Sequence, residues 1–338
     1  MIEVPFPDPE GRFQVHGLYW WEEVRPHLWR LPQRHRDRVT PVVSVLSEQP
    51  CGARVVCLTD ARTIWVRVGF PAQGELLNLS RLGRQGLDYY VDGAFCRGLI
   101  PSGEAEQEFC LFDGGLPGGL HDITVYLAQY GPQEILALRY LPDSAVFEAP
   151  TAYALPKPLA VYGSSITQGG CSSRPSLNWP ARLARSLNLD LINLGMSGGA
   201  LGEPFMWEIM AEIDACCYIL DYGINITPAE KLEEVYAPFV DSLRAARPEV
   251  PVVCVSPIFS AWEAWGSDYR LNRMRGHIRQ VCEDRADDPL LFHVAGLELL
   301  GPDDRDGICD ASHANDIGFK YMAERMEPTV RRALSLGA

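Results

Sequence analysis

The second half of the chain alternates short apolar runs with longer amphipathic stretches, and this pattern constrains its fold more than any other feature. Near-continuous apolar runs lie at residues 159–163, 189–195, 216–223, 251–259 and 290–296. Amphipathic stretches of helical character follow them, at residues 176–188, 204–213, 233–246, 269–285 and 317–334. Strands that are apolar at nearly every position are typical of parallel sheets, which are buried on both faces. The pattern therefore predicts a flavodoxin-like, doubly wound parallel α/β sheet.

The first half of the chain follows a different pattern. Apolar and polar residues alternate in "ARTIWVRVGF" (61–70) and in "HDITVYLAQ" (121–129), and no stretch shows a convincing helical period. Alternation of this kind predicts an all-β sandwich or jelly-roll domain. Because four prolines lie within residues 141–158, we predict a β domain at 1–142, a proline-rich linker at 143–158 and an α/β domain at 159–338.

Charge and cysteine spacing exclude several classes of function. A net charge of −14 argues against nucleic acid and anionic membranes as partners. The basic run at residues 25–38 is interrupted by proline and aspartate and is interpreted as a solvated edge or loop. The ten cysteines show no CxxC pair or zinc spacing, and the first residues show no signal-peptide pattern. We therefore expect a cytoplasmic protein with reduced thiols, no metal and no cofactor; its oligomeric state is left open, a homo-oligomer included.

Polar groups follow the ends of several predicted strands. Ser164 and Ser165 come directly after the first strand, a glycine cluster containing Gly198 follows the second, and Asn225 follows the third. Asp310 and His313 come after the fifth strand, just before the last predicted helix. The carboxyl ends of parallel strands lie at one edge of the sheet, where ligands bind in open α/β folds. We therefore expect these groups to lie at one site.

This set of groups suits acyl transfer. A serine hydroxyl needs a base, histidine is the natural base near neutral pH, and a carboxylate holds the imidazole in the required tautomer. Backbone N–H groups and an amide supply donors for the oxyanion that develops. Taken singly, each element is more commonly a turn, a cap or a tight loop. Their joint occurrence in this order favours an enzyme, and of the seven histidines only His313 lies in such a loop beside a carboxylate.

Several short motifs resemble those of the SGNH (GDSL-type) hydrolase superfamily. "GSSITQG" is similar to its first block, "NLGMSGGA" to its glycine block, "DYGIN" to its asparagine block and "DASH" to its Asp-x-x-His block. Upstream, "GLDYY" (86–90) resembles the GxDLY signature of a β domain that precedes one branch of these esterases, as do "WRLP" and "CSSRP". The resemblance covers nearly the whole chain.

The resemblance implies a role for each matched residue. Ser165 would be the nucleophile, His313 the base and Asp310 the carboxylate that orients it. The oxyanion hole would consist of the Ser165 N–H, the Gly198 N–H and the Asn225 side chain. The strand-end argument reaches the same residues independently, which is why we retain them as the candidate site.

The chain departs from the family pattern at three positions. Ser164 stands where the family has aspartate before the nucleophile. Asn225 is followed by Ile226 rather than aspartate, and His313 is followed by Ala314 where proline is common. None of these changes removes a predicted catalytic group.

The hypothesis is a serine esterase that hydrolyses short-chain acyl esters, with acetylated carbohydrate as one substrate class. Ser164 and Trp262 are the predicted substrate contacts, although Trp262 and Trp265 are interpreted equally well as core residues. An acyltransferase that uses the same triad is the alternative. A non-catalytic carbohydrate-binding protein is a third hypothesis, which the intact serine, histidine and aspartate disfavour.

Overall fold

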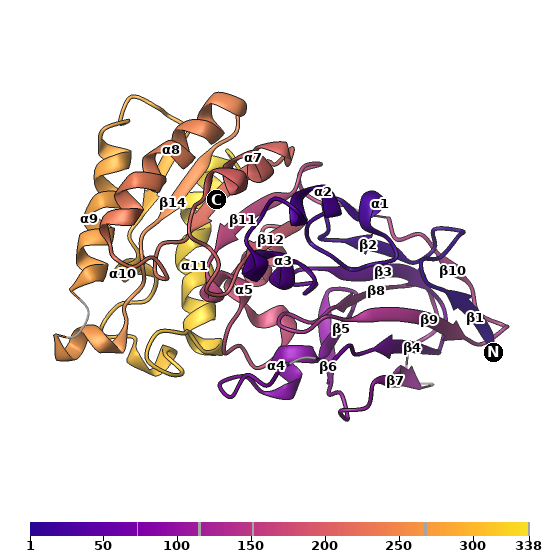
Figure 1. Cartoon of the computed structure of the whole chain (residues 1–338). Coiled ribbons are helices and arrows are strands. Elements are labelled where there is room, and N and C mark those ends of the chain that lie inside the picture. The colour runs from indigo at the N-terminus through magenta and orange to yellow at the C-terminus, as the bar shows by residue number, and fades with distance from the viewer. Residues whose placement is uncertain (73, 114–115, 151, 267–268, 337–338) are drawn as a thin grey trace. The chain divides into compact units, whose positions relative to one another are not determined.

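A computed structural model of the chain describes residues 1–72, 74–113, 116–150, 152–266 and 269–336. The chain divides into two compact units (Figure 1), and each contains a segment from the other half of the sequence. Unit 1 comprises Met1–Gln33, Ser47–Ala152 and Ser173–Ser176; unit 2 comprises Arg34–Leu46, Tyr153–Ser172 and Leu177–Ala338. The predicted domain bounds, with a linker at residues 143–158, do not include these two segments, one in each unit, that come from the other half of the sequence. The bounds stay a prediction. Thr151, within the predicted linker, lies outside the described residues.

Unit 1 consists mainly of antiparallel strands. Its elements are β1 (Ile2–Pro5), β2 (Gln14–His16), α1 (Trp21–Val24), β3 (Arg54–Thr59), β4 (Thr63–Gly69), α4 (Arg81–Gln85), β5 (Leu87–Val91), β6 (Ala94–Leu99), β7 (Glu106–Asp113), β8 (His121–Tyr126), β9 (Glu134–Tyr140) and β10 (Val146–Phe147). In the described residues one sheet has the order β1-β9-β4-β7, and a second has the order β10-β3-β8-β5-β6 with β2 added beside β3.

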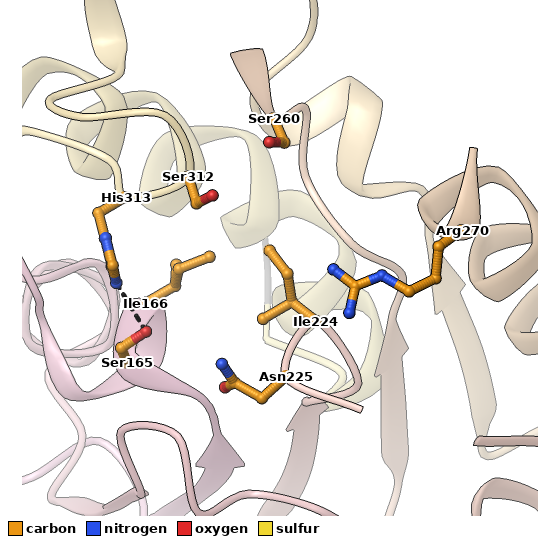
Figure 2. Close-up of a pocket in the computed structure, with 8 residues that line it drawn as sticks. All are labelled: Ser165, Ile166, Ile224, Asn225, Ser260, Arg270, Ser312 and His313. Atoms are coloured by element: carbon orange, nitrogen blue, oxygen red, sulfur yellow. Dashed lines mark hydrogen bonds between the residues drawn. The ribbon is translucent and has the colours of Figure 1, made fainter. Parts of the chain in front are cut away.

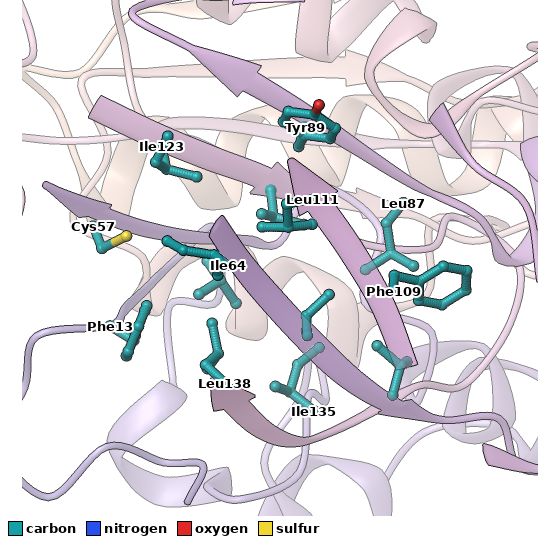
Figure 3. Packing of buried hydrophobic residues seen from close by; sticks show 14 of the residues in the cluster. Phe13, Cys57, Ile64, Leu87, Tyr89, Phe109, Leu111, Ile123, Ile135 and Leu138 are labelled. Carbon is teal, nitrogen blue, oxygen red and sulfur yellow. The ribbon is translucent and has the colours of Figure 1, made fainter. Parts of the chain in front are cut away.

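The core of unit 1 lies between these two sheets (Figure 3). Alternate residues of the strands point inward: Ile64 and Leu138 come from the first sheet, Leu87 and Ile123 from the second, and all four are buried. This packing confirms the predicted β-sandwich. The sequence did not predict the short helices α1 and α4, because four or five residues are too few to show a helical period.

A buried ion pair links two of the sequence motifs inside unit 1. Asp88, from "GLDYY", accepts hydrogen bonds through Oδ2 from Arg174 Nη1 at 2.9 Å, from Ser176 N at 2.9 Å and from Ser176 Oγ at 2.6 Å. Arg174 and Ser176 belong to the segment that begins with "CSSRP". The Arg174 guanidinium also lies 3.6 Å from the centre of the Phe95 ring. The GxDLY aspartate thus holds the segment Ser173–Ser176 against the sandwich.

Unit 2 contains a parallel sheet with helices on both faces (Figure 1). Its strands are β11 (Leu159–Gly163), β12 (Leu191–Gly195), β13 (Cys217–Asp221), β14 (Val252–Val255) and β15 (Leu291–Val294). Its main helices are α5 (Ser165–Gln168), α6 (Trp179–Ser186), α7 (Pro204–Glu212), α8 (Glu230–Ala246), α9 (Arg270–Glu283), α10 (Gly296–Leu299) and α11 (Asp316–Ala333), with short 3-10 turns η2 (Ala261–Trp265) and η3 (Arg305–Gly307). Of a further 3-10 turn, η1 (Pro175–Leu177), the first two residues belong to unit 1 and the last to unit 2.

The strand order of this sheet in the described residues is β12-β11-β13-β14-β15. Numbered along the unit, this is the order 2-1-3-4-5, which confirms the predicted flavodoxin-like topology. Every residue of β11, β12 and β13 is buried, because α6 packs with α11 while α7, α8 and α9 pack in succession. The strand order reverses between β11 and β13, and ligands bind such sheets at this switch point.

The interpretation of residues 25–38 as a solvated edge or loop is wrong for part of the run. Helices α2 (Gln33–Arg36) and α3 (Pro41–Ser47) span most of the segment that belongs to unit 2. His35 is only 1% exposed, and its Nε2 lies 2.9 Å from Glu212 at the end of α7. Arg34 contacts the same carboxylate, and Arg38 pairs with Glu208. The basic residues are therefore partners for the acidic face of α7.

A helix that crosses a membrane needs about 20 consecutive, predominantly apolar residues. Within the described residues, none is both long and apolar enough to cross a membrane.

Candidate active site

The turn between β11 and α5 presents Ser165 in a fixed position. A Cβ on Gly163 would lie 2.0 Å from Thr167 Oγ1 and 2.4 Å from the Asp221 carbonyl oxygen, so only glycine fits. Ser164 is the N-cap of α5, and its Oγ accepts a hydrogen bond from Ile166 N at 3.2 Å. Serine replaces the family's aspartate here without loss, because both residue types are good N-caps. Ser165 is the first helical residue, at the carboxyl end of the strand.

Ser165, His313 and Asp310 form a continuous hydrogen-bonded series, of which Figure 2 shows the contact between Ser165 and His313. His313 Nε2 lies 2.8 Å from Ser165 Oγ, and His313 Nδ1 lies 2.8 Å from Asp310 Oδ2. Ser165 and His313 are 148 residues apart in the sequence. They meet because β11 lies inside the sheet and the loop before α11 returns to the same edge.

The loop before α11 keeps Asp310 ionised. Its Oδ1 accepts hydrogen bonds from the backbone N–H groups of Ser312 and His313, both at 2.9 Å. Partial burial acts to raise the pKa of Asp310, but these two donors and the His313 ring outweigh it and hold the pKa well below its ordinary value. A carboxylate that stays charged beside Nδ1 favours the tautomer in which Nε2 faces the serine as an acceptor.

Gly198 and Asn225 follow β12 and β13, the strands on either side of β11. Gly198 has φ +69°, a left-handed conformation that favours glycine, and a Cβ there would meet nothing within 4 Å. Glycine is therefore favoured at position 198 by the backbone conformation and not by crowding from neighbouring atoms. Asn225 lines the same pocket as Ser165, and Figure 2 shows its amide group facing that serine. Its Oδ1 is buried and finds no hydrogen-bond partner in the described part of the chain.

The pocket in front of Ser165 has a volume of about 300 Å³. It is lined by Ser165, Ile166, Ile224, Asn225, Ser260, Arg270, Ser312 and His313. Sequence reasoning missed Ser260 and Arg270, which come from a loop and a helix start that carry no motif, and it gave no role to Ser312 within the "DASH" block. Arg270 Nη1 donates to the Ile226 carbonyl oxygen at 3.1 Å and to Thr227 Oγ1 at 2.6 Å. Figure 2 shows its guanidinium directed toward Ile224 and Asn225.

Comparison with known families explains this arrangement. The sequence profile described as "GDSL-like Lipase/Acylhydrolase family" matches residues 156–331, more than half of the chain. The chain belongs to the GDSL-like lipase/acylhydrolase family. The profile described as "N-terminus of Esterase_SGNH_hydro-type", named GxDLY, matches residues 6–137. Membership in this family places the chain among the ester hydrolases and confirms the resemblance seen in the motifs.

Solved structures share the architecture over 85% to 99% of the chain. A protein from Bacteroides ovatus described as a GDSL-like lipase is 26% identical, with a TM-score of 0.89 over 99% of this chain and 98% of its own. The salicylyl-acyltransferase SsfX3 from a tetracycline biosynthetic pathway is 21% identical, with a TM-score of 0.81 over 99% and 96%. A family two carbohydrate esterase from Clostridium thermocellum is 17% identical, with a TM-score of 0.65 over 85% and 94%. The search of curated proteins found no match.

A second aspartate lies buried behind the turn between β11 and α5 of this GDSL-like protein. Asp221 ends β13 directly beside Gly163, and its Oδ2 accepts a hydrogen bond from Thr167 Oγ1 at 2.8 Å. Burial raises the pKa of Asp221 to about 7, although the Thr167 hydroxyl acts to lower it. Sequence reasoning treated this residue only as the start of the "DYGIN" motif, because its burial depends on the packing around it.

Of the two predicted substrate contacts, Ser164 is buried and Trp262 is exposed. Ser164 is almost completely buried, and its hydroxyl caps α5. Trp262 and Trp265 are 55% and 81% exposed, so the alternative interpretation as core residues is wrong. Both lie in η2, a 3-10 turn in which residues three apart project from the same side. Ser260, which lines the pocket, is the N-cap of this turn. Contact of Ser164 or Trp262 with a substrate stays a prediction.

Proposed function

We propose that this GDSL-like protein is a serine esterase that hydrolyses short-chain acyl esters. The observation that carries the proposal is the hydrogen-bonded series from Asp310 through His313 to Ser165, which ends in an open pocket. Serine, imidazole and carboxylate in this order constitute the arrangement that activates a hydroxyl for acyl transfer.

The proposed mechanism assigns one role to each group. His313 Nε2 removes the proton from Ser165 as Oγ attacks the ester carbonyl, and ionised Asp310 stabilises the imidazolium that forms. The oxyanion is bound by the N–H groups of Ser165 and Gly198 and by the amide of Asn225. His313 then gives its proton to the departing alcohol. A water molecule, activated by the same imidazole, releases the acid from the acyl-enzyme.

The size and lining of the pocket favour a small acyl group on a polar alcohol. A volume of about 300 Å³ is at the lower end of the range for small-molecule sites. Hydroxyl, amide and guanidinium groups outnumber the two isoleucines that line it. The exposed indoles of Trp262 and Trp265 offer apolar faces of the kind on which sugar rings stack. We therefore propose acetylated carbohydrate as the substrate class, in keeping with the carbohydrate esterases among the structural neighbours.

The test is a panel of p-nitrophenyl esters of increasing acyl length, assayed beside acetylated sugars. We expect the highest kcat/KM for acetyl or propionyl esters, and Ser165 should be labelled by a fluorophosphonate probe. The Ser165→Ala variant serves as the matched control and should show neither labelling nor turnover. Labelling at another residue, or a preference for long acyl chains, would contradict the proposal.

The second candidate function is that of an acyltransferase. It is supported by the salicylyl-acyltransferase SsfX3, whose structure aligns over 99% of this chain. The same triad serves either reaction, because only the acceptor of the acyl group differs. Incubation with an acyl donor in the presence of competing alcohols, followed by mass spectrometry, distinguishes them. Free acid as the main product supports the esterase, whereas a new ester supports the acyltransferase.

A further inference from the structure

We propose that Cys171, Asp310 and His313 form a zinc site whose occupation inhibits the enzyme. The ligand atoms of these residues all lie within 4.8 Å of one another. Cys171 Sγ is 3.8 Å from Asp310 Oδ2, and His313 Nδ1 is 2.8 Å from the same oxygen. The thiol and Nδ1 thus both approach the same carboxylate oxygen, and a metal ion there would meet Nδ1, the ring nitrogen that does not face Ser165.

The three groups suit zinc in chemistry and in spacing. Thiolate, imidazole and carboxylate are the ligand types that bind zinc, with bond lengths of about 2.0–2.3 Å. Tetrahedral geometry with those lengths separates the ligand atoms by about 3.3–3.8 Å. The Cys171–Asp310 distance of 3.8 Å already meets this range, and His313 needs to move from Asp310 by less than 1 Å, by that geometry. Solvent supplies the fourth ligand, because the Asp310 side chain is exposed.

The backbone holds the thiol in this position. Cys171 has φ +71°, in the left-handed region that residues with a side chain seldom adopt. It follows Gly169 and Gly170, and it is buried, so its side chain has little freedom to turn away. Residues held in such sparsely populated backbone conformations cluster at functional sites.

Inhibition follows from the proton balance, and this step rests on the proposed role of His313 as the base. Zinc displaces the Cys171 thiol proton to solvent and takes the lone pair of Nδ1. The single proton of the neutral imidazole then resides on Nε2. Nε2 becomes a donor toward Ser165 Oγ and has no lone pair with which to accept the serine proton. The nucleophile is left inactive while the fold is unchanged.

The experiment measures zinc binding and inhibition separately. The ester assay uses the full chain under a non-thiol reductant, with ZnCl₂, CaCl₂ or MgCl₂ added. The rate of each variant is normalised to its own rate without added metal. We expect zinc alone to inhibit, EDTA to restore the rate, and Cys171→Ser to need about tenfold more zinc or higher. Cys309→Ser, at an exposed cysteine near the same loop, is the matched control and should keep the original sensitivity.

Cobalt binding to the Ser165→Ala variant gives a readout that does not depend on catalysis. Co²⁺ should produce a thiolate-to-cobalt charge-transfer band, and adding Cys171→Ser should abolish it while adding Cys309→Ser should not. Equal zinc sensitivity of Cys171→Ser and the unchanged chain, or a cobalt spectrum without the thiolate band, would overturn the proposal. If the band is present but zinc does not inhibit, the site exists and the role of His313 as the base is wrong.

Discussion

Two aspartates, one in each unit, belong to networks that contain a serine and a basic side chain, and the two networks differ in kind. In unit 1 the Asp88 side chain is 0% exposed and pairs with Arg174 and Ser176. In unit 2 the Asp310 side chain is 36% exposed and pairs with His313, which reaches Ser165. Arginine is charged at all physiological pH, whereas histidine exchanges its proton near neutrality. The first network therefore suits structure, and the second suits proton transfer.

The surroundings of the two carboxylates reinforce this difference. The Asp88 side chain is fully buried against the segment Ser173–Ser176, where removal of one charge leaves the other buried without its ionic partner. Asp310 lies in a loop beside a pocket, where solvent and substrate have access. Substitution should accordingly affect stability at Asp88 and rate at Asp310. The predictions below test that contrast, beginning with the largest expected effect.

Ser165→Ala should lower kcat by about 10⁴-fold or more, because no nucleophile remains for His313 to activate. The unfolding midpoint should change little. Ser164→Ala is the neighbouring control and should lose about 1 kcal/mol of stability with its N-cap hydrogen bond, with a much smaller effect on rate. An active Ser165→Ala beside an inactive Ser164→Ala would show that the nucleophile has been misassigned.

Asp310→Asn should lower kcat by about 10²- to 10⁴-fold with little change in KM, because the carboxylate matters most once the imidazolium forms. Steady-state kinetics and thermal unfolding together make the measurement, and the melting temperature should stay close to that of the unchanged chain. Asp306→Asn, on the same loop, is the control. A damaging Asp306→Asn with a silent Asp310→Asn would transfer the role to the other carboxylate.

Asp88→Asn should destabilise the protein by about 3 kcal/mol, because it leaves the Arg174 charge largely buried without its partner. Denaturant unfolding measures the loss, and the rate per folded molecule should fall less than tenfold. Asp92→Asn is the matched control, since Asp92 pairs with His121 at the surface of the same unit and should cost about 1 kcal/mol at most. Equal losses for the two variants would remove the structural role assigned to Asp88.

Asp221→Asn should stabilise the protein increasingly as pH rises from about 4 to about 7. The unfolded chain ionises this group near its ordinary value of 3.8, whereas burial holds the folded pKa at about 7. The native state therefore loses stability across that window, by roughly 4 kcal/mol in total, and the loss is constant above it. Asparagine does not ionise in this pH range and still accepts the Thr167 hydrogen bond.

Urea unfolding at several pH values provides the measurement for Asp221→Asn. Asp241→Asn, at an exposed carboxylate on α8, should show a pH profile close to that of the unchanged chain. A stabilisation that is the same at pH 4 and pH 8 would contradict the raised pKa.

Exhaustive EDTA treatment should have the smallest effect. The proposed mechanism uses only side-chain and backbone groups, so activity should stay the same or rise slightly as inhibitory zinc is removed. The ester assay before and after chelation tests this. Loss of activity that a divalent cation restores would overturn the metal-free mechanism.

Much of the architecture could be predicted from local sequence patterns. Fully apolar runs and amphipathic stretches predict the parallel sheet of unit 2, because burial on both faces leaves no room for alternation. Ser165, Asn225 and His313 were expected at one edge because the carboxyl ends of parallel strands meet there. The structure does bring Ser165 and His313 within hydrogen-bond distance. Short helices such as α4 escaped prediction because they carry too few residues to show a period.

The sequence by itself determined the two classes of fold and the choice of candidate site residues, because both depend on local periodicity and short motifs. Only the tertiary structure decided which distant partners surround them. Cys171 and Asp310 are 139 residues apart, Asp88 and Ser176 are 88 apart, and Thr167 and Asp221 are 54 apart. Burial of Asp221 and the approach of a thiol to the imidazole arise from packing between such segments, and no local pattern of residues encodes them.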